Sequence, residues 1–304
     1  MIDTVAYTTH TATEESPFLL PSDDMFGEVE TSLSFQKARG ASAALTPTGY
    51  IPTANSKALK AVWHAAKRIE RGDVIVSLPV GAGWLKDDHI KQLIGVCARI
   101  TQPKALIMTG QFDPSADSKE LPANLRRLMG EVEHMALMRT DLAGLDAMAH
   151  GALFAGIGGD SSMRHSVPAH ERALSSGFNG PWHASVLLPD LMCFTKGNVI
   201  ADRYANEDPP RCSCDVCDGR GLHRFDPLAR MEAEDHNNLI WREWFFTMAA
   251  RSPGTARQAW WRDKCAAAID RYSLENQRLG LSSRGGFQVP KPLKAWASLP
   301  VLGH

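Results

Sequence analysis

The stretch that decides the fold reads Asp73-Val-Ile-Val-Ser-Leu-Pro-Val80 and resumes, after a helical segment, as Lys104-Ala-Leu-Ile-Met-Thr109. Both runs are short and apolar, which is typical of strands that are buried on both faces. The segment between them, residues 86–100, carries apolar residues at helical spacing: Ile90, Leu93, Ile94 and Cys97. A strand, a helix and a second strand with short connections predict a βαβ unit, with parallel strands and a right-handed crossover.

The same alternation continues on both sides of this unit. Further strands are expected at residues 43–50, 134–139 and 152–158, and further helices at residues 56–70, 121–132 and 142–150. The pattern predicts an α/β protein with a (β/α)8 TIM-barrel-like domain. Only five strands are clear, so we expect a barrel that is incomplete, divergent or completed by another chain. An open doubly wound sheet is the alternative architecture.

In either architecture, functional side chains follow the carboxyl ends of the strands. Among the polar residues at these positions, six are the candidates for a binding or catalytic face: Gln111, Arg139, Asp141, Asp160, Arg164 and His165.

A second signal lies in the last third of the chain, where Arg211-Cys-Ser-Cys-Asp-Val-Cys-Asp218 places three thiols within six residues. Thiolates and imidazoles arranged in a closed tetrahedron are the ligands that Zn²⁺ prefers. We therefore predict a structural Zn²⁺ site formed by Cys212, Cys214, Cys217 and His236. His223 is the competing fourth ligand.

Composition points to an ordinary globular protein, with 44% hydrophobic and 22% charged residues and a formal net charge of −1. No stretch approaches the run of about 18 apolar residues that spans a bilayer, and the first residues lack the pattern of a signal peptide. Cys97, Cys193 and Cys265 stand alone, which is not a disulfide framework. We expect a cytoplasmic protein without membrane partners.

Composition shifts divide the chain into four parts. Residues 1–39 are predicted to be an acidic N-terminal extension, residues 40–195 the barrel-like domain, residues 196–280 a zinc-binding subdomain with helices, and residues 281–304 a tail with little regular structure. Residues 199–204 are interpreted as a strand. Residues 211–304 hold 14 Lys and Arg against 10 Asp and Glu, a mild basic excess that suits nucleic acid.

The segment around the cysteines resembles that of the tRNA-guanine transglycosylases. In that family a short strand pair precedes C-x-C-x-x-C, and a zinc-ligating His follows at the start of a helix. The matching pieces here are residues 194–201, the three cysteines and His236-Asn-Asn-Leu239. The resemblance covers roughly residues 40–250. It implies a (β/α)8 barrel with a zinc-binding insertion, and exchange of a guanine base for a 7-deazaguanine in nucleic acid, with one Asp as nucleophile and a second as general acid/base.

The chain departs from the family at both catalytic motifs. The family nucleophile lies in Phe-Asp-Cys-Val-x-Pro-Thr-Arg, and Gly156 falls at the corresponding position here. The motif Asp-Ser-Gly-Gly-Phe-Gln, which holds the other Asp, is absent.

Two functional hypotheses arise from these observations. The first is a diverged transglycosylase-like enzyme that acts on a guanine or 7-deazaguanine base in tRNA or DNA by pentosyl transfer. In it Asp160, Asp141 and His165 are the acid/base candidates, while Gln111 binds the base and Arg139 and Arg164 bind phosphate. Asp141 also suits a helix N-cap and Asp160 a turn, so each has a structural alternative.

The second hypothesis is a non-catalytic zinc-containing subunit or nucleic-acid-binding partner, which forms a homodimer or a heteromer through the zinc subdomain. A weaker third interpretation is a phosphate-binding turn at residues 156–162, which matches neither Walker A nor G-x-G-x-x-G.

Overall fold

The computed structural model describes residues 1–20, 28–110, 120–171, 184–225, 229–282 and 285–301. The chain forms two compact units. Unit 1 comprises residues 1–157 and 165–174, and unit 2 comprises residues 158–164 and 175–304. Unit 2 thus starts earlier in the chain than the expected boundary at residue 195, because residues 158–164 and residues 175–195 both belong to it.

Unit 1 is built on a parallel sheet with the strand order β1-β2-β3-β4-β5. The strands are β1 Ala44–Leu45, β2 Val74–Gly81, β3 Lys104–Thr109, β4 Met135–Thr140 and β5 Ala155–Ile157. The helices that connect them are α2 Ser56–Ala66, α3 Asp87–Cys97, α4 Glu120–Glu131 and α5 Ala143–Ala149. Each strand thus pairs with the next one along the chain, as the βα alternation predicts.

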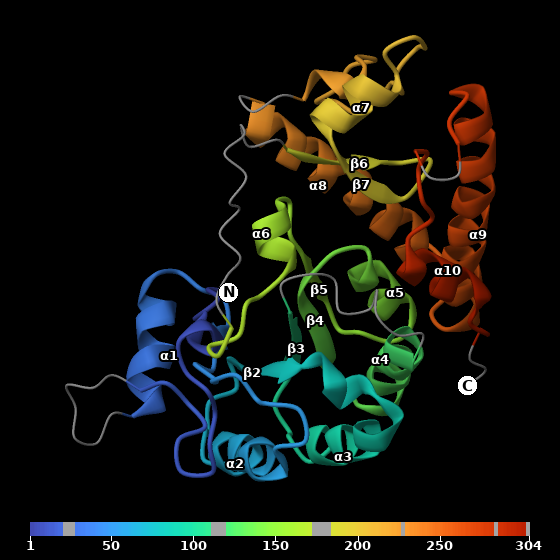
Figure 1. Ribbon diagram of the computed structural model, residues 1–304. Coiled ribbons are helices and arrows are strands. Elements are labelled where there is room, and N and C mark those ends of the chain that lie inside the picture. Colours follow the sequence, from blue (N-terminus) through green and yellow to red (C-terminus); the bar gives the residue numbers. More distant parts are fainter. Residues whose placement is uncertain (21–27, 111–119, 172–183, 226–228, 283–284, 302–304) are drawn as a thin grey trace. The chain divides into compact units, whose positions relative to one another are not determined.

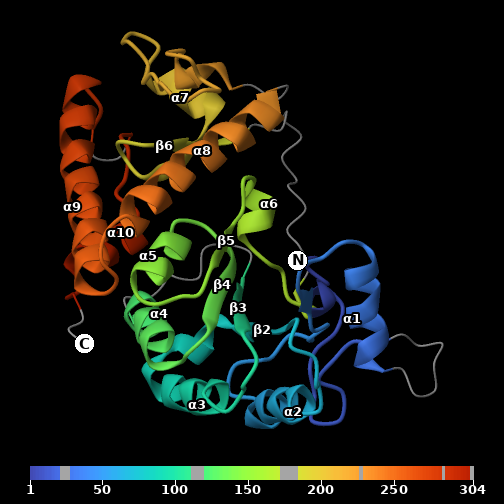
Figure 2. The same cartoon turned by 180° about the vertical axis from the view of Figure 1, so that it is seen from behind.

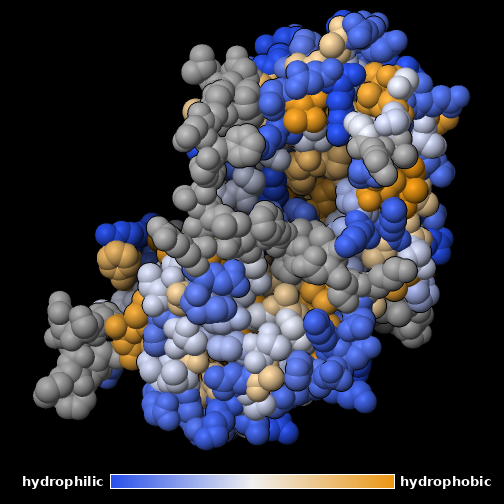
Figure 3. All heavy atoms as spheres, in the orientation of Figure 1, coloured by the Kyte–Doolittle hydropathy of each residue, from blue (hydrophilic) through white to orange (hydrophobic). Residues whose placement is uncertain are grey.

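The helices lie along one side of this curled sheet, as in half of a barrel (Figures 1 and 2). The outer surface over α2 and α3 is hydrophilic (Figure 3). The other, concave face carries a cluster of small and aliphatic side chains, namely Leu45, Ile75, Ala105 and Ala136. Nearer the carboxyl ends of the strands, Tyr7 from the N-terminal segment and Tyr50 pack with Ile107 on this face. The predicted α/β class is confirmed, and the described residues form a half-barrel.

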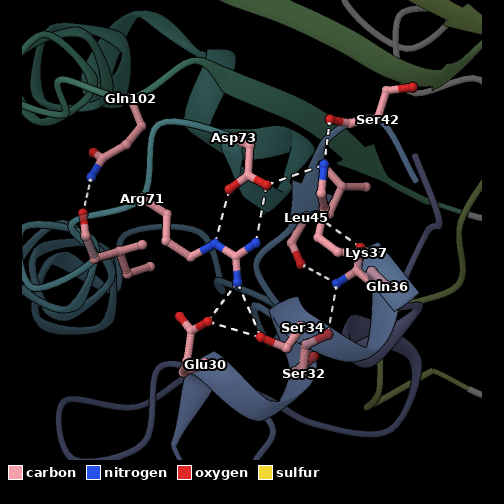
Figure 4. Close-up of polar contacts among 11 residues, drawn as sticks. Glu30, Ser32, Ser34, Gln36, Lys37, Ser42, Leu45, Arg71, Asp73 and Gln102 are labelled. Atoms are coloured by element: carbon pink, nitrogen blue, oxygen red, sulfur yellow. Dashed lines mark hydrogen bonds and ion pairs between the residues drawn. The ribbon is translucent and has the colours of Figure 1, made fainter. Parts of the chain in front are cut away.

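The N-terminal part that the sequence analysis set apart is built into unit 1. Helix α1, Val29–Ala38, lies beside β1, and Gln36 is 2% exposed. The Gln36 Nε2 atom donates to the Leu45 carbonyl at 2.7 Å, and the Leu45 N–H donates to Gln36 Oε1 at 2.9 Å (Figure 4). The Ala44 N–H points to the other side of β1 and donates to the carbonyl of Asp73, just before β2. One amide side chain therefore satisfies the outer hydrogen-bonding edge of β1.

An ion-pair network holds α1 in this position. Arg71 bonds to Glu30 and Ser34 of α1 and to Asp73, which precedes β2, and Lys37 of α1 also reaches Asp73 at 3.1 Å (Figure 4). These groups are partly exposed, so the individual pairs are weak, but they all join α1 to the start of β2.

A buried ion pair joins α4 to α5 on the outer layer. The Arg126 guanidinium contacts Asp146 through Nε at 3.0 and 3.1 Å and through a terminal nitrogen at 2.6 Å. The two side chains are 4% and 0% exposed. Such a pair depends on both partners, because either charge alone would be buried without compensation.

His150 lies beside this pair and is 4% exposed. Its Nδ1 bonds to the Asp146 carbonyl at 2.7 Å, and its Nε2 has no partner among the described residues. Burial lowers the pKa of His150; the Arg126 charge lowers it further, and the Asp146 charge opposes both effects.

We expect this histidine to make the fold sensitive to mild acid. In the unfolded chain its pKa is about 6.5, so below that pH the unfolded state binds a proton that the folded state resists. Stability should therefore fall as the pH decreases below about 6.5. In His150→Gln the difference between urea midpoints at pH 7.5 and pH 5.5 should be smaller than in the wild type.

The matched control is His64→Gln, because His64 is exposed and should leave the pH dependence of the wild type unchanged. An equal loss of stability in the wild type and in His150→Gln would contradict the prediction.

Unit 2 contains a two-stranded antiparallel sheet of β6 Ser185–Leu188 and β7 Cys193–Lys196. Its helices are α6 Ser161–Arg164, α7 Gly197–Arg203, α8 Arg230–Ala249, α9 Thr255–Arg278 and α10 Lys291–Ser298.

Two sequence-based interpretations in unit 2 are wrong. Residues 199–204 were expected to be a strand, yet residues 197–203 form α7. Gly197 permits this, because a Cβ there would lie 1.8 Å from the Phe225 carbonyl oxygen. The tail 281–304 contains helix α10, with Trp296 only 3% exposed. Its prolines do not oppose a helix, because Pro290 precedes it and Pro292 lies in its first turn.

Candidate metal centre and the predicted catalytic residues

The three cysteines lie in a tight loop that the backbone closes on itself. The N–H groups of Cys217 and Asp218 both donate to the Cys214 carbonyl at 2.9 Å, and Gly219 N–H donates to the Cys212 carbonyl at 2.9 Å. Asp218 and Gly219 have positive φ values of 48° and 74°, a conformation that glycine adopts readily and Asp tolerates. An antiparallel β-bridge between the backbones of Arg211 and Gly221 closes the base of the loop.

This loop and helix α8 bring four ligand atoms together. The sulfurs of Cys212, Cys214 and Cys217 and a ring nitrogen of His236 all lie within 4.8 Å of one another. His236 Nδ1 is 3.6 Å from Cys214 Sγ and 3.3 Å from Cys217 Sγ. The group can hold one metal ion. His236 is thus the histidine of the group, as predicted, whereas His223 is exposed and lies outside it.

The remaining contacts of His236 fix its ring. Its Nε2 lies 2.9 Å from the Leu187 carbonyl of β6, and the side chain is fully buried. When Nε2–H donates to this carbonyl, Nδ1 presents its lone pair to the sulfurs. A hydrogen bond of this kind sets the tautomer of a metal-binding histidine.

The charge of the group also suits a cation. A hydrogen bond from the Cys217 thiol lowers the pKa of Cys212, because the shared proton stabilises the Cys212 thiolate. A guanidinium nitrogen of Arg224 lies 3.7 Å from Cys217 Sγ and offsets part of the negative charge.

Asn237, next to His236, was missed by sequence reasoning. It is fully buried and bonds three backbone groups: Leu187 N–H to its Oδ1 at 2.7 Å, and its Nδ2 to the carbonyls of Ser185 at 2.7 Å and Gly159 at 3.0 Å. Asn237 therefore docks α8 on β6 and positions His236. The available sequence signal was an amide side chain directly after the candidate metal ligand on a helix. The hydrogen-bond partners of Asn237 lie 50 or more residues away in the chain.

Asp160 and Arg164, two of the predicted site residues, lie within unit 2 and are bound into its structure. Asp160 accepts bonds from Ser161 and Ser162 at the start of α6 and pairs with Arg230 at the start of α8; its side chain is 4% exposed. Arg164 is buried, bonds to Ser185 Oγ at 2.9 Å and stacks 3.7 Å above the Phe194 ring.

The other described candidates lie in unit 1. Asp141 accepts a bond at 3.0 Å from the N–H of Ala143, the first residue of α5, whose N-cap position is Leu142. Arg139, at the carboxyl end of β4, pairs with Asp3 and donates to the His165 carbonyl at 3.2 Å. Gln111 lies outside the described residues. That all these residues share one face stays a prediction.

Sequence reasoning also missed Asp3, a carboxylate brought to the carboxyl end of the parallel sheet. Its Oδ2 lies 2.6 Å from Arg139 Nε, a contact across 136 positions of sequence. No local motif marks this residue, because its surroundings form only when the N-terminal segment packs on the sheet.

Comparison of the chain with models of protein families, with curated proteins and with solved structures gives no match. Over the ranges that the structure covers, no helix combines the length and the apolar character needed to cross a bilayer. What the candidate metal centre can bind is therefore inferred from the chemistry of its own residues.

Proposed function

We propose that Cys212, Cys214, Cys217 and His236 hold a structural Zn²⁺ ion. Three sulfurs and one imidazole form a closed donor set of the structural type. Zn–S and Zn–N bonds of about 2.3 and 2.05 Å in a tetrahedron separate sulfur from nitrogen by about 3.6 Å, and the two distances from His236 Nδ1 to sulfur are 3.3 and 3.6 Å. The ion, when bound, would join the cysteine loop to α8.

We propose further that the chain is a diverged transglycosylase-like protein that acts on a guanine or 7-deazaguanine base in tRNA or DNA. The observation that carries this proposal is the Cys3His group itself, which follows the β6-β7 strand pair and closes on α8 at His236-Asn-Asn-Leu239. The resemblance to the transglycosylases rests on this same order of elements. The parallel sheet of unit 1 would then be part of a (β/α)8 barrel.

Completion of that barrel would have to begin at β5. Gln36 already bonds the outer edge of β1, so a strand added there would first have to displace α1. Strands from a divergent part of this chain or from a second chain would pair first with residues 155–157, and closure of the barrel would also require α1 to leave the edge of β1.

A specific observation favours the second candidate function, a non-catalytic zinc-containing subunit or nucleic-acid-binding partner. The two carboxylates proposed from the sequence both have structural partners, because Asp160 pairs with Arg230 and Asp141 accepts a bond from the Ala143 N–H at the start of α5. Gly156 falls at the position where the transglycosylases, which this chain resembles, carry their nucleophile. In this role the chain would retain the zinc-containing fold and contribute surface to a complex.

A base-exchange assay separates the two functions. Labelled guanine is offered with tRNA and with duplex DNA to the wild type and to Asp160→Asn, Asp141→Asn and the double variant. Asp263→Asn serves as the control, because Asp263 is an exposed carboxylate. The enzyme hypothesis expects incorporation by the wild type and the control, and loss to background in the double variant, with circular dichroism verifying that each protein is folded.

Incorporation that survives in the folded double variant would remove the assignment of both carboxylates. No incorporation by the wild type, alone or with cellular extract, would contradict the enzyme hypothesis. Binding of labelled tRNA or DNA by that same inactive protein would then support the subunit role.

A further inference from the structure

Three side chains meet at the carboxyl end of the sheet in unit 1. Asp3 Oδ2 accepts bonds from Arg139 Nε at 2.6 Å and from the Tyr7 hydroxyl at 2.9 Å, and Asp3 Oδ1 accepts one from Val5 N–H at 3.0 Å. The opposite side of the guanidinium donates to the His165 carbonyl at 3.2 Å. The Asp3 carboxylate thus forms an ion pair with the Arg139 guanidinium at the carboxyl end of the sheet, where parallel α/β folds bind ligands.

The backbone at Arg139 is unusual in a way that points to a ligand site. Its φ is 50°, and the pairing of β4 with β5 shifts register between Met138 and Thr140. A left-handed conformation at a non-glycine residue is costly, and such residues cluster at ligand-binding positions. A bulge redirects a side chain at the end of a strand, and here it turns the guanidinium toward Asp3.

The segment that carries Asp3 is attached more loosely than the residues after it. Met1 and Val5 are 51% and 40% exposed, and Val5 has a positive φ of 46°. Two residues later the chain is firmly anchored, since Tyr7 is 1% exposed. The Asp3 and Arg139 side chains remain 20% and 24% exposed, so solutes reach them, and partly exposed ion pairs contribute little to stability.

We propose that Arg139 is an anion site for a phosphate group and that Asp3 is the built-in carboxylate which the phosphate displaces. A guanidinium binds carboxylate and phosphate in the same geometry, and the phosphate carries more charge and more acceptor oxygens. The Tyr7 hydroxyl, which donates to Asp3, would donate to a phosphate oxygen in its place. Residues 1–5 move aside, with Tyr7 as the fixed point.

The ligand class is a phosphate of a nucleic acid strand, and in this respect the inference rests on the proposed function. The anion site itself does not require base exchange. When the Asp3 carboxylate occupies the site in most molecules, phosphate binds only the remaining fraction in which the site is open. The apparent affinity for phosphate is then the intrinsic affinity multiplied by this open fraction.

The test measures binding of inorganic phosphate and of a short single-stranded oligonucleotide by isothermal titration calorimetry. Asp3→Asn keeps an acceptor for Tyr7 and Val5 but loses the charge, so it should bind phosphate about tenfold more tightly than the wild type. Asp3→Asn combined with Arg139→Gln should lose this binding. Glu30→Gln is the matched control, since it removes one charge from another arginine pair of unit 1 and should bind phosphate as the wild type does.

Equal phosphate affinity in the wild type and Asp3→Asn, or unchanged affinity in Arg139→Gln, would overturn the inference. If Asp3→Asn does not fold, the wild type still gives an answer: phosphate, compared with chloride at equal ionic strength, should raise its melting temperature but not that of Arg139→Gln. Phosphate binding without oligonucleotide binding would reject the nucleic acid as ligand. Base exchange without phosphate binding would overturn this inference alone, and phosphate binding without base exchange would leave it standing.

Discussion

Cys214→Ser is expected to lose its bound metal and, with it, the folded structure of the cysteine loop and the start of α8. The free energy of binding a structural zinc ion is about 10–16 kcal/mol in small zinc-finger peptides, which is as large as the whole stability of a typical domain, about 5–15 kcal/mol. Cys214 is the informative ligand because it is only half-buried, so serine there creates little strain of its own. Metal content by mass spectrometry and limited proteolysis around residues 205–240 measure both effects.

The controls use residues of the same types outside the group. Cys193→Ser lies on β7 and should keep the metal. His223→Asn should also keep it, whereas His236→Asn should lose it. A wild-type protein purified without metal, or loss of metal in His223→Asn but not in His236→Asn, would contradict the assigned ligands.

The second large effect is expected at the buried ion pair of unit 1. Asp146→Leu leaves the Arg126 guanidinium buried without its carboxylate, and removal of one partner of such a pair costs about 3–5 kcal/mol. Urea unfolding followed by circular dichroism measures the loss. The double variant Arg126→Met with Asp146→Leu should recover most of it, because no charge then stays buried.

The double variant makes this prediction specific. If it is as unstable as Asp146→Leu alone, the loss arises from poor packing between α4 and α5, and the uncompensated charge is not the cause. A loss below about 1 kcal/mol in Asp146→Leu would match an exposed pair instead.

The parallel strands could be predicted because their signal is local. Strand β3 was predicted at residues 104–109, its observed bounds, since an apolar run lies there between Pro103 and Gly110. The metal group was predictable for a similar reason, because three cysteines within six residues can turn their sulfurs toward one ion when the chain forms a tight loop. Local pattern also misled, since β-branched Val199 and Ile200 favour a strand in isolation, while in the fold they belong to helix α7.

The parts that could not be predicted depend on distant contacts. Helix α1 has weak amphipathic character, and its position depends on the bonds of Gln36 and the Arg71 network. The inclusion of residues 158–164 in unit 2 depends on Asp160 and Arg164 bonding to α8 and β6. Asp3 and Asn237 have their roles only because residues far apart in sequence meet them in the fold.

The contact between Gln36 and Leu45 has a consequence for how this protein can be shortened. A chain that begins near residue 40 would keep all five parallel strands but leave the Leu45 N–H and C=O without partners. An uncovered strand edge of this kind recruits strands from other molecules and leads to self-association. The first helix thus covers the β1 edge of the sheet, and its removal should make the protein more prone to self-association.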